Sequence, residues 1–194
     1  MSMIAIPFAV DLDKVKSVFG SNDKELLENV RLTKKYSTYS DQMQDYSYDK
    51  ALEDIISNSL NENVGHVYGY ALIAICDYLG EHLLPMCDGF YYGDDWETAK
   101  EIIKKNGVTI DIERMFETRD VFPIPEIPDF PTINYFTKEE VEKIAMQMDK
   151  VEIDESKADM DNDDFDEIQE YLLNIRNCFK TAKEKNVELV TFMH

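Results

Sequence analysis

The sequence predicts an α+β fold that is mostly helical, with about six to seven helices beside a small sheet. Apolar residues recur every three or four positions over most of the chain, as on one face of an α-helix. Short runs rich in β-branched and aromatic residues stand near the two ends, at Met3–Val10 and Val187–Phe192. The sheet is therefore expected to form from N-terminal and C-terminal strands.

The N-terminal strand, Met3–Val10, contains Pro7 in its middle. Because proline has no amide hydrogen to donate to a neighbouring strand, we expect this strand at an edge of the sheet or bent at that point. The C-terminal strand is expected to pair with it and to hold both termini in one fold. No repeat and no Gly/Ser-rich linker divides residues 1–194, which predicts a single globular domain.

Apolar stripes at helical spacing, together with capping and stop residues, place the helices. They are expected over residues 13–19, 22–35, 46–60, 67–84, 94–106, 138–149 and 163–185. Asp11 precedes the first helix and Gly20 ends it. Ser21 or Asn22 is expected to cap the second, and the polar stretch 33–44 is expected to be a loop.

The helix over 67–84 has almost no polar face, which predicts that it is the most buried helix of the fold. Tyr68, Tyr70 and Tyr78 on this helix are expected in the core. Two glycines within it indicate close packing against a neighbouring element rather than the approach of a ligand.

The second half of the chain adds a connector and two well-marked helices. Val108–Ile110 is expected to be a short strand. Residues 122–131 hold four of the six prolines, whose fixed φ and missing amides predict an extended connector. Thr137 and Glu140 form a T-x-x-E capping box at the start of the next helix, and the apolar stripe over 163–185 is the most regular of the chain.

The chain carries 40 Asp and Glu against 20 Lys and Arg, a net charge of −20 with a pI of about 4.4. A field this negative repels phosphate backbones and anionic lipids, which disfavours direct binding of nucleic acid or membranes. The longest apolar run, Tyr70–Cys76, is far shorter than the ~20 residues of a membrane span, and the start lacks a signal-peptide pattern. Three cysteines at irregular spacing favour a reducing compartment, so the expected location is the cytoplasm.

No common catalytic or nucleotide-binding motif is present, and the sequence implies no cofactor. Carboxylates are abundant, however, so a small hydrolase that uses a carboxylate cluster, with or without a metal ion, is the alternative to a binding protein. Such an enzyme is expected to gather carboxylates in a cleft near His66 or His82.

Four carboxylates share the spacing of an EF-hand calcium loop, namely Asp159, Asp161, Asp163 and Glu170. The sixth position of such a loop requires glycine for a sharp turn, and Asp164 stands there. We therefore expect no metal site here and interpret the segment as the acidic N-terminus of a helix, which the helix dipole stabilises. A calcium-responsive protein is the alternative.

Tyrosines lie among acids in two regions of the chain. Nine of the eleven tyrosines fall between residues 36 and 92, and from 36 to 97 twelve acids accompany a single Lys or Arg, Lys50. The expected partner-binding residues are Tyr36, Tyr39, Asp41, Asp45 and Tyr46 in the first region and Tyr91, Tyr92, Asp94, Asp95 and Trp96 in the second. Tyr and Trp anchor protein interfaces, and acids steer a basic partner toward them. The alternative is that several of these rings belong to the core.

Four segments together resemble a family of uncharacterised bacterial proteins of the same length. They are IPFAVDLDKVKSVFGS (6–21), HVYGYALIAICDYLGEHL (66–83), IPDFPTINYF (127–136) and VELVTFMH (187–194). The end of the chain is more distantly similar to the small bacterial YfbM-like proteins. The resemblance implies a bacterial cytosolic α+β domain, and it implies no activity.

The preferred interpretation is a non-enzymatic, acidic protein-interaction module that binds a basic protein partner, as an immunity protein or an inhibitor does. The chain is accordingly expected not to be an enzyme. Association with the partner is expected to slow, and its salt dependence to flatten, when Asn replaces Asp41, Asp45, Asp94 and Asp95.

Overall fold

The structure, a computed structural model, describes residues 3–40, 47–85, 89–119 and 121–194. Within these ranges there are eight α-helices, one 3-10 helix and five strands. The helices are α1 (Leu12–Ser17), α2 (Lys24–Arg31), α3 (Lys34–Ser40), α4 (Tyr48–Ser57), α5 (Gly65–Leu79), α6 (Asp94–Lys105), α7 (Lys138–Met148), α8 (Glu167–Lys185) and the 3-10 helix η1 (Ile112–Phe116). The strands are β1 (Ile4–Val10), β2 (Glu81–His82), β3 (Phe90–Tyr91), β4 (Thr132–Phe136) and β5 (Glu188–Met193). The predicted α+β class, mostly helical with a small sheet, is confirmed.

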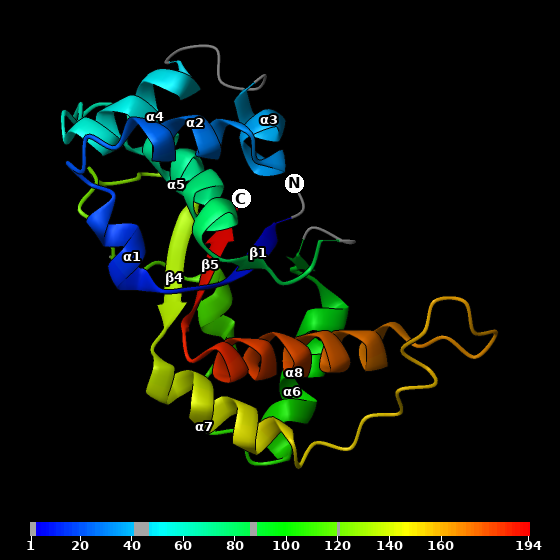
Figure 1. The fold of residues 1–194 in the computed structure, drawn as a ribbon. Helices are drawn as coiled ribbons and strands as arrows, with labels where there is room; N and C mark the ends of the chain where they lie inside the picture. The colour runs from blue at the N-terminus through cyan, green and yellow to red at the C-terminus, as the bar shows by residue number, and fades with distance from the viewer. Residues whose placement is uncertain (1–2, 41–46, 86–88, 120) are drawn as a thin grey trace.

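The strands form one antiparallel sheet in the order β2-β1-β5-β4, with β3 on the same side of β1 as β2. β1 and β5 pair from Ala5 opposite Met193 to Val10 opposite Glu188. The N-terminal and C-terminal strands therefore lie side by side in the centre of the sheet, as predicted (Figure 1).

Helices cover both faces of the sheet, which gives the molecule three layers. α1–α5 lie on one face and α6–α8 on the other (Figure 1). Each helical layer has its own core, because successive residues of a strand point to opposite faces. In β1, Ile6, Phe8 and Val10 enter the first core, and Ala5 and Ala9 enter the second. The small side chains on the second face let α8 pack closely against β1.

The central helix α5 is almost wholly buried, as its sequence predicts. A Cβ at Gly69 would lie 2.7 Å from the Pro131 ring, and one at Gly80 would lie 2.5 Å from the Ala9 carbonyl oxygen. The two glycines thus serve close packing against the proline-rich connector and β1. No helix in the described ranges combines the length and apolar character needed to cross a membrane.

The three tyrosines of α5 occupy different environments. Tyr68 is fully buried and Tyr70 is half-buried, but Tyr78 is 40% exposed, so its predicted place in the core is wrong. Tyr78 lies near the end of the helix, where its hydroxyl accepts a hydrogen bond from Asn29 of α2 at 3.1 Å. The position near the helix end, rather than the apolar stripe, determines its exposure.

The predicted edge position of the first strand is wrong, because β1 has neighbours on both sides. The N–H of Leu83 donates to the carbonyl of Pro7 at 3.0 Å, so the backbone of Pro7 faces the side of β2 and β3. These two short strands pair with β1 on either side of Pro7 and leave it opposite neither. A proline is tolerated inside this sheet because its missing N–H falls in the gap between them.

The predicted second helix ends early, and a further helix follows it. Asp23, not Ser21 or Asn22, caps α2 by accepting the Leu26 N–H at 3.0 Å. α3 then forms within the stretch that the sequence predicts as a loop, and its Tyr39 is buried against α5. Packing on α5 outweighs the low helix propensity of this polar segment and raises the helix number above the expected range.

The connector region differs from prediction at both of its ends. Val108–Ile110 forms no strand, because the Thr109 N–H donates to the side chain of Gln147 on α7 at 3.0 Å. Residues 122–131 contain no helix or strand, in agreement with the expected extended connector. β4 follows at once and pairs with β5, which the sequence analysis did not predict.

The C-terminal helices begin where their caps are. The capping box of Thr137 and Glu140 is present and starts α7, as predicted. α8 begins at Glu167 and not at residue 163, because Asp166 is its cap and accepts the Ile168 N–H at 2.9 Å. The acidic residues before Asp166 therefore lie in turns outside the helix.

Candidate functional site

The described rings of the first predicted region, Tyr36 and Tyr39, turn toward the interior. Tyr39 is 3% exposed and packs on Tyr70 with 5.1 Å between ring centroids. Tyr36 is half-buried and packs on the buried Tyr48 at 5.2 Å. The remaining predicted residues of this region lie outside the described residues, namely Asp41, Asp45 and Tyr46.

The carboxylate nearest these rings, Asp49, already has internal partners. Arg31 Nε lies 2.6 Å from Asp49 Oδ1, and the Tyr36 hydroxyl donates to the same oxygen at 2.8 Å. The hydrogen bond from Arg31 holds the pKa of Asp49 below its usual value. Burial and the hydrogen bond to Asp49 raise the pKa of Tyr36. This acid is therefore neutralised within the protein.

The second predicted region is divided between surface and core. Tyr91 is 48% exposed and Tyr92 is 37% exposed, and Asp94 is exposed at the start of α6. Trp96 is fully buried, with its ring 4.9 Å from that of Phe116. Trp96 therefore packs in the core beneath this surface, and its predicted role as a contact residue is wrong.

A groove opens between the first turns of α6 and α8, which pack against each other. It has a volume of about 330 Å³. We call it the acidic groove and define it by six of its lining residues, Tyr91, Asp95, Met160, Glu167, Glu170 and Tyr171. The Tyr171 hydroxyl donates to the Tyr91 carbonyl at 3.2 Å and joins the two sides. Met160 is 70% exposed, so the groove combines carboxylates with accessible apolar surface.

Two carboxylates of the acidic groove face each other. The hydrogen bond between Glu167 and Asp95, together with the charge of Asp95, raises the pKa of Glu167 above its usual value. No Lys or Arg in the described ranges forms an ion pair with Asp95, Glu167 or Glu170. Both helices direct their positive N-terminal ends here, which stabilises part of the negative charge. The groove therefore holds like charges that an incoming cation would relieve.

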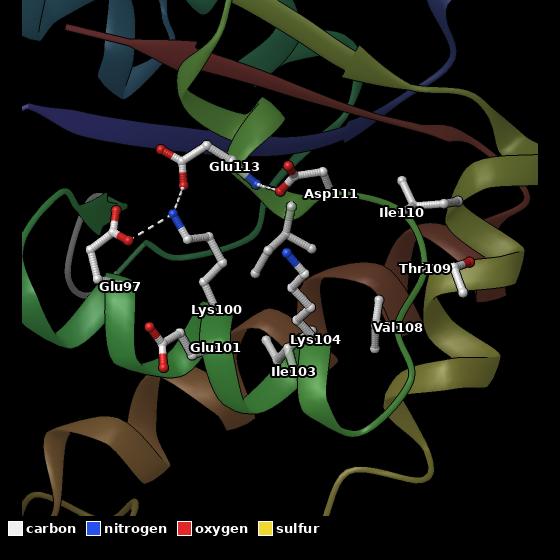
Figure 2. A pocket seen from close by; sticks show the side chains of 11 residues that line it. Glu97, Lys100, Glu101, Ile103, Lys104, Val108, Thr109, Ile110, Asp111 and Glu113 are labelled. Atoms are coloured by element: carbon white, nitrogen blue, oxygen red, sulfur yellow. Dashed lines mark hydrogen bonds and ion pairs between the residues drawn. The ribbon is translucent and has the colours of Figure 1, made fainter.

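A second cavity lies on the other face of α6, and there a lysine pairs with the carboxylates (Figure 2). Its volume is about 490 Å³, and Lys100 Nζ lies between Glu97 Oε2 (2.8 Å) and Glu113 Oε2 (2.5 Å). Burial lowers the pKa of Lys100, but the bonds to Glu113 and Glu97 outweigh it and raise this pKa above its usual value. Lys100 is protonated at neutral pH, so it is no amine nucleophile. Trp96 Nε1 also donates to Glu113 at 3.2 Å, which makes this cluster a structural network.

His66 and His82 were expected near a cleft that gathers carboxylates. His66 is exposed on α5, and the His82 ring stacks on Phe8 with 5.1 Å between centroids. Neither lines any of the four cavities described for this structure. In the part of the chain that the structure describes, no three His, Cys, Asp or Glu side chains are placed to hold a metal ion.

The four carboxylates with EF-hand spacing are separated in the structure. Asp159, Asp161 and Asp163 are exposed in turns, and the Asp159 carboxylate accepts the Asp161 N–H at 3.0 Å. Glu170 lies in α8 and lines the acidic groove instead. The sequence spacing therefore does not correspond to a calcium loop among the described residues.

The α8 side of the groove was not predicted from the sequence. Glu170 and Tyr171 lie three and four positions after Glu167, so the three residues share one face of the helix. This spacing could have indicated a polar site on α8, but the same residues are also typical of the solvent-facing side of a helix with an apolar stripe. The pairing of α8 with α6 is a tertiary contact that no local pattern contains.

The comparisons with known proteins identify a family. No curated protein and no solved structure matches the chain. The family model described as a domain of unknown function, DUF7691, matches residues 1–194, in agreement with the expected uncharacterised family. The chain therefore belongs to the DUF7691 family.

Proposed function

We propose that this protein is a non-enzymatic interaction module that binds a basic protein partner through the acidic groove, in the manner of an immunity protein or an inhibitor. The observation that carries the proposal is the Asp95–Glu167 pair, a close pair of carboxylates without a cation among the described residues. We place this function in the cytoplasm, because three cysteines at irregular spacing favour a reducing compartment.

A Lys or Arg side chain of the partner fits the chemistry of the groove. Its cation would lie between Asp95 and Glu167 and would form charge-assisted hydrogen bonds to both. The apolar stem of such a side chain can lie on Met160 and on the rings of Tyr91 and Tyr171, which also attract a cation through their faces. The groove thus offers both parts of a basic side chain a complementary surface.

The net charge supports the approach of such a partner. A net charge of −20 attracts a basic protein over a long range and raises its association rate at low salt. Asp49 and Asp54, which lie near the described tyrosines of the first region, are paired with Arg31 and Lys50 and offer a partner no free contact. Affinity is therefore expected to reside in the groove and steering in the whole surface.

The test is capture and titration with matched charge variants. The tagged chain is incubated with a lysate of its own cells at low salt, and a retained basic protein is identified by mass spectrometry. That partner is then purified and titrated by calorimetry against the wild-type chain and its variants. The variant D95N/E167Q is expected to weaken binding by about tenfold or more. The control D13N/E25Q makes the same charge change at exposed positions of α1 and α2, on the other helical layer, and is expected to alter mainly the salt dependence. Equal losses in both variants would reject the groove.

The same carboxylate pair supports a second candidate, a small hydrolase. Two carboxyl groups joined by a hydrogen bond, one of them with a raised pKa, are the arrangement of the carboxylate dyad of aspartic proteases, in which one group acts as acid and the other as base. Wild type and E167Q are compared on a panel of peptides and esters. Turnover that E167Q abolishes would favour the enzyme, and the absence of turnover by wild type would remove it.

A further inference from the structure

Aromatic side chains form much of the wall of the acidic groove. Phe90 and Phe165 line it together with Tyr91 and Tyr171. Phe90 is 2% exposed and lies deepest, Phe165 and Tyr171 are half-buried, and Tyr91 is 48% exposed. The groove therefore offers a ligand aromatic surface as well as carboxylates.

Contacts within the protein hold these rings in place. The Phe90 ring packs against the rings of Tyr171 and Trp96, with 6.0 Å and 5.6 Å between centroids. The Tyr171 hydroxyl donates to the Tyr91 carbonyl at 3.2 Å and ties α8 to β3. The aromatic wall is thus formed before a ligand arrives, which lowers the entropy lost on binding.

The carboxylates of the groove attract a cation without selecting one. Asp95 of α6 and Glu167 of α8 are joined by a hydrogen bond, so their oxygens lie close enough for one cation to contact both. The ammonium group of lysine has three N–H donors and the guanidinium of arginine has five, and either forms charge-assisted hydrogen bonds to two carboxylates. Charge alone therefore does not decide which basic side chain fits the groove.

The rings do distinguish the two cations. The guanidinium of arginine is planar and weakly hydrated and stacks on aromatic faces, whereas the ammonium of lysine is compact and holds its water strongly. Contacts between a cation and a ring are accordingly formed more often by arginine. An arginine therefore gains more than a lysine from a groove in which rings and carboxylates lie together.

We propose that the acidic groove selects arginine over lysine, so that the basic partner is recognised through an arginine side chain. The guanidinium donates to Asp95 and Glu167 and stacks on the aromatic wall, and the apolar stem lies on Met160. This inference rests on the proposed function, because it names the side chain that the partner places in the same site.

The test titrates the full chain, labelled with ¹⁵N, with two blocked pentapeptides of equal charge at low salt, Ac-GGRGG-NH2 and Ac-GGKGG-NH2. The arginine peptide is expected to shift the amide resonances of Tyr91, Asp95 and Glu167 in a saturable manner and to bind about threefold more tightly than the lysine peptide. Equal affinities with shifts in the groove would overturn the selection of arginine and leave the proposed function standing. Shifts outside the groove with both peptides would overturn both.

Variants separate the rings from the charge. Tyr91→Leu is expected to remove most of the preference for arginine, whereas Tyr91→Phe keeps the ring and is expected to retain it. Glu167→Gln is expected to weaken both peptides alike. Tyr78→Leu is the matched control, since Tyr78 is 40% exposed on α5 in the other helical layer, and it is expected to leave the preference unchanged.

Phe165→Leu is the second ring variant and is used if Tyr91→Leu does not fold. It removes a half-buried ring of the groove without changing the charge, and it is expected to lower the preference as well. An unchanged preference for arginine in the folded ring variant, or an equal loss in Tyr78→Leu, would overturn the assignment to the aromatic wall.

Discussion

The two regions in which tyrosine lies among acids have a similar composition and different surroundings in the fold. Between Tyr36 and Asp49 the described rings turn inward, and Asp49 binds Arg31. Around Tyr91 and Asp95 the rings are exposed and the acids face other acids. Composition alone therefore does not distinguish an internal network from an exposed acidic surface.

The elements that meet at each region explain the difference. In the α1–α5 layer, α2, α3, α4 and α5 surround the tyrosines and bring Arg31 of α2 to Asp49 of α4, while Lys50 pairs with Asp54 one turn along α4. In the α6–α8 layer, the N-terminal ends of two helices meet. The positive end of the helix dipole favours acidic residues in the first turn of each helix. Acids selected separately for each helix start thus become a like-charge pair when α6 packs on α8.

The largest effect on the free energy of unfolding is expected when Asp54, the most buried acid of the internal network, is replaced. Asp54 is 2% exposed and accepts hydrogen bonds from Lys50 Nζ at 2.5 Å and from the Tyr68 hydroxyl at 3.0 Å. Asp54→Ala removes both bonds and is expected to lower the free energy of unfolding by about 3 kcal/mol. Urea denaturation measures the loss. Asp159→Ala on the exposed turn is the control, with an expected change within about 0.5 kcal/mol.

A smaller effect is expected from one hydroxyl in each region. The Tyr48 hydroxyl donates to the Tyr70 carbonyl at 2.8 Å, and Tyr48 is 2% exposed. Tyr48→Phe is expected to cost about 1 kcal/mol of unfolding free energy, whereas Tyr91→Phe at the exposed site is expected to cost almost nothing. The same urea measurement compares them. Equal losses would contradict the inward and outward assignment of the two regions.

Much of the fold could be predicted from local patterns. The capping box of Thr137 and Glu140, the apolar run of α5 and the two terminal strands are confirmed, because each depends on residues close in sequence. β4 was missed because its pairing with β5 joins distant segments. α3 was missed because packing on α5, and not propensity, stabilises it.

The candidate site could be predicted only in part. Tyr91 and Asp95 were named from composition, and they do line the acidic groove. Glu167 and Tyr171 were not, because their proximity to Asp95 depends on how α8 lies against α6. Trp96 was named as a contact but is buried, since it lies on the inner face of α6.

The smallest expected effect is a difference in how stability depends on pH at two helix starts. It tests most directly whether the acids of the acidic groove repel each other. Asp95 raises the pKa of Glu167, whereas the backbone amide of Glu139 and the Thr137 hydroxyl lower the pKa of Glu139. Both are glutamates in a first helical turn. A raised pKa in the folded state contributes stability below the ordinary value of about 4.3 and loses it as the pH rises. A lowered pKa contributes stability above that value and loses it as the pH falls.

Glutamine removes each titration without changing the size of the side chain. Between about pH 4 and pH 7, the melting temperature of E167Q is therefore expected to rise relative to that of wild type, and that of E139Q to fall. Thermal unfolding followed by circular dichroism measures both differences. Slopes of the same sign would mean that the groove acids are no more strained than those of an ordinary helix start. Opposite slopes would show that the acidic groove stores repulsion at neutral pH, which a cation from a partner can relieve.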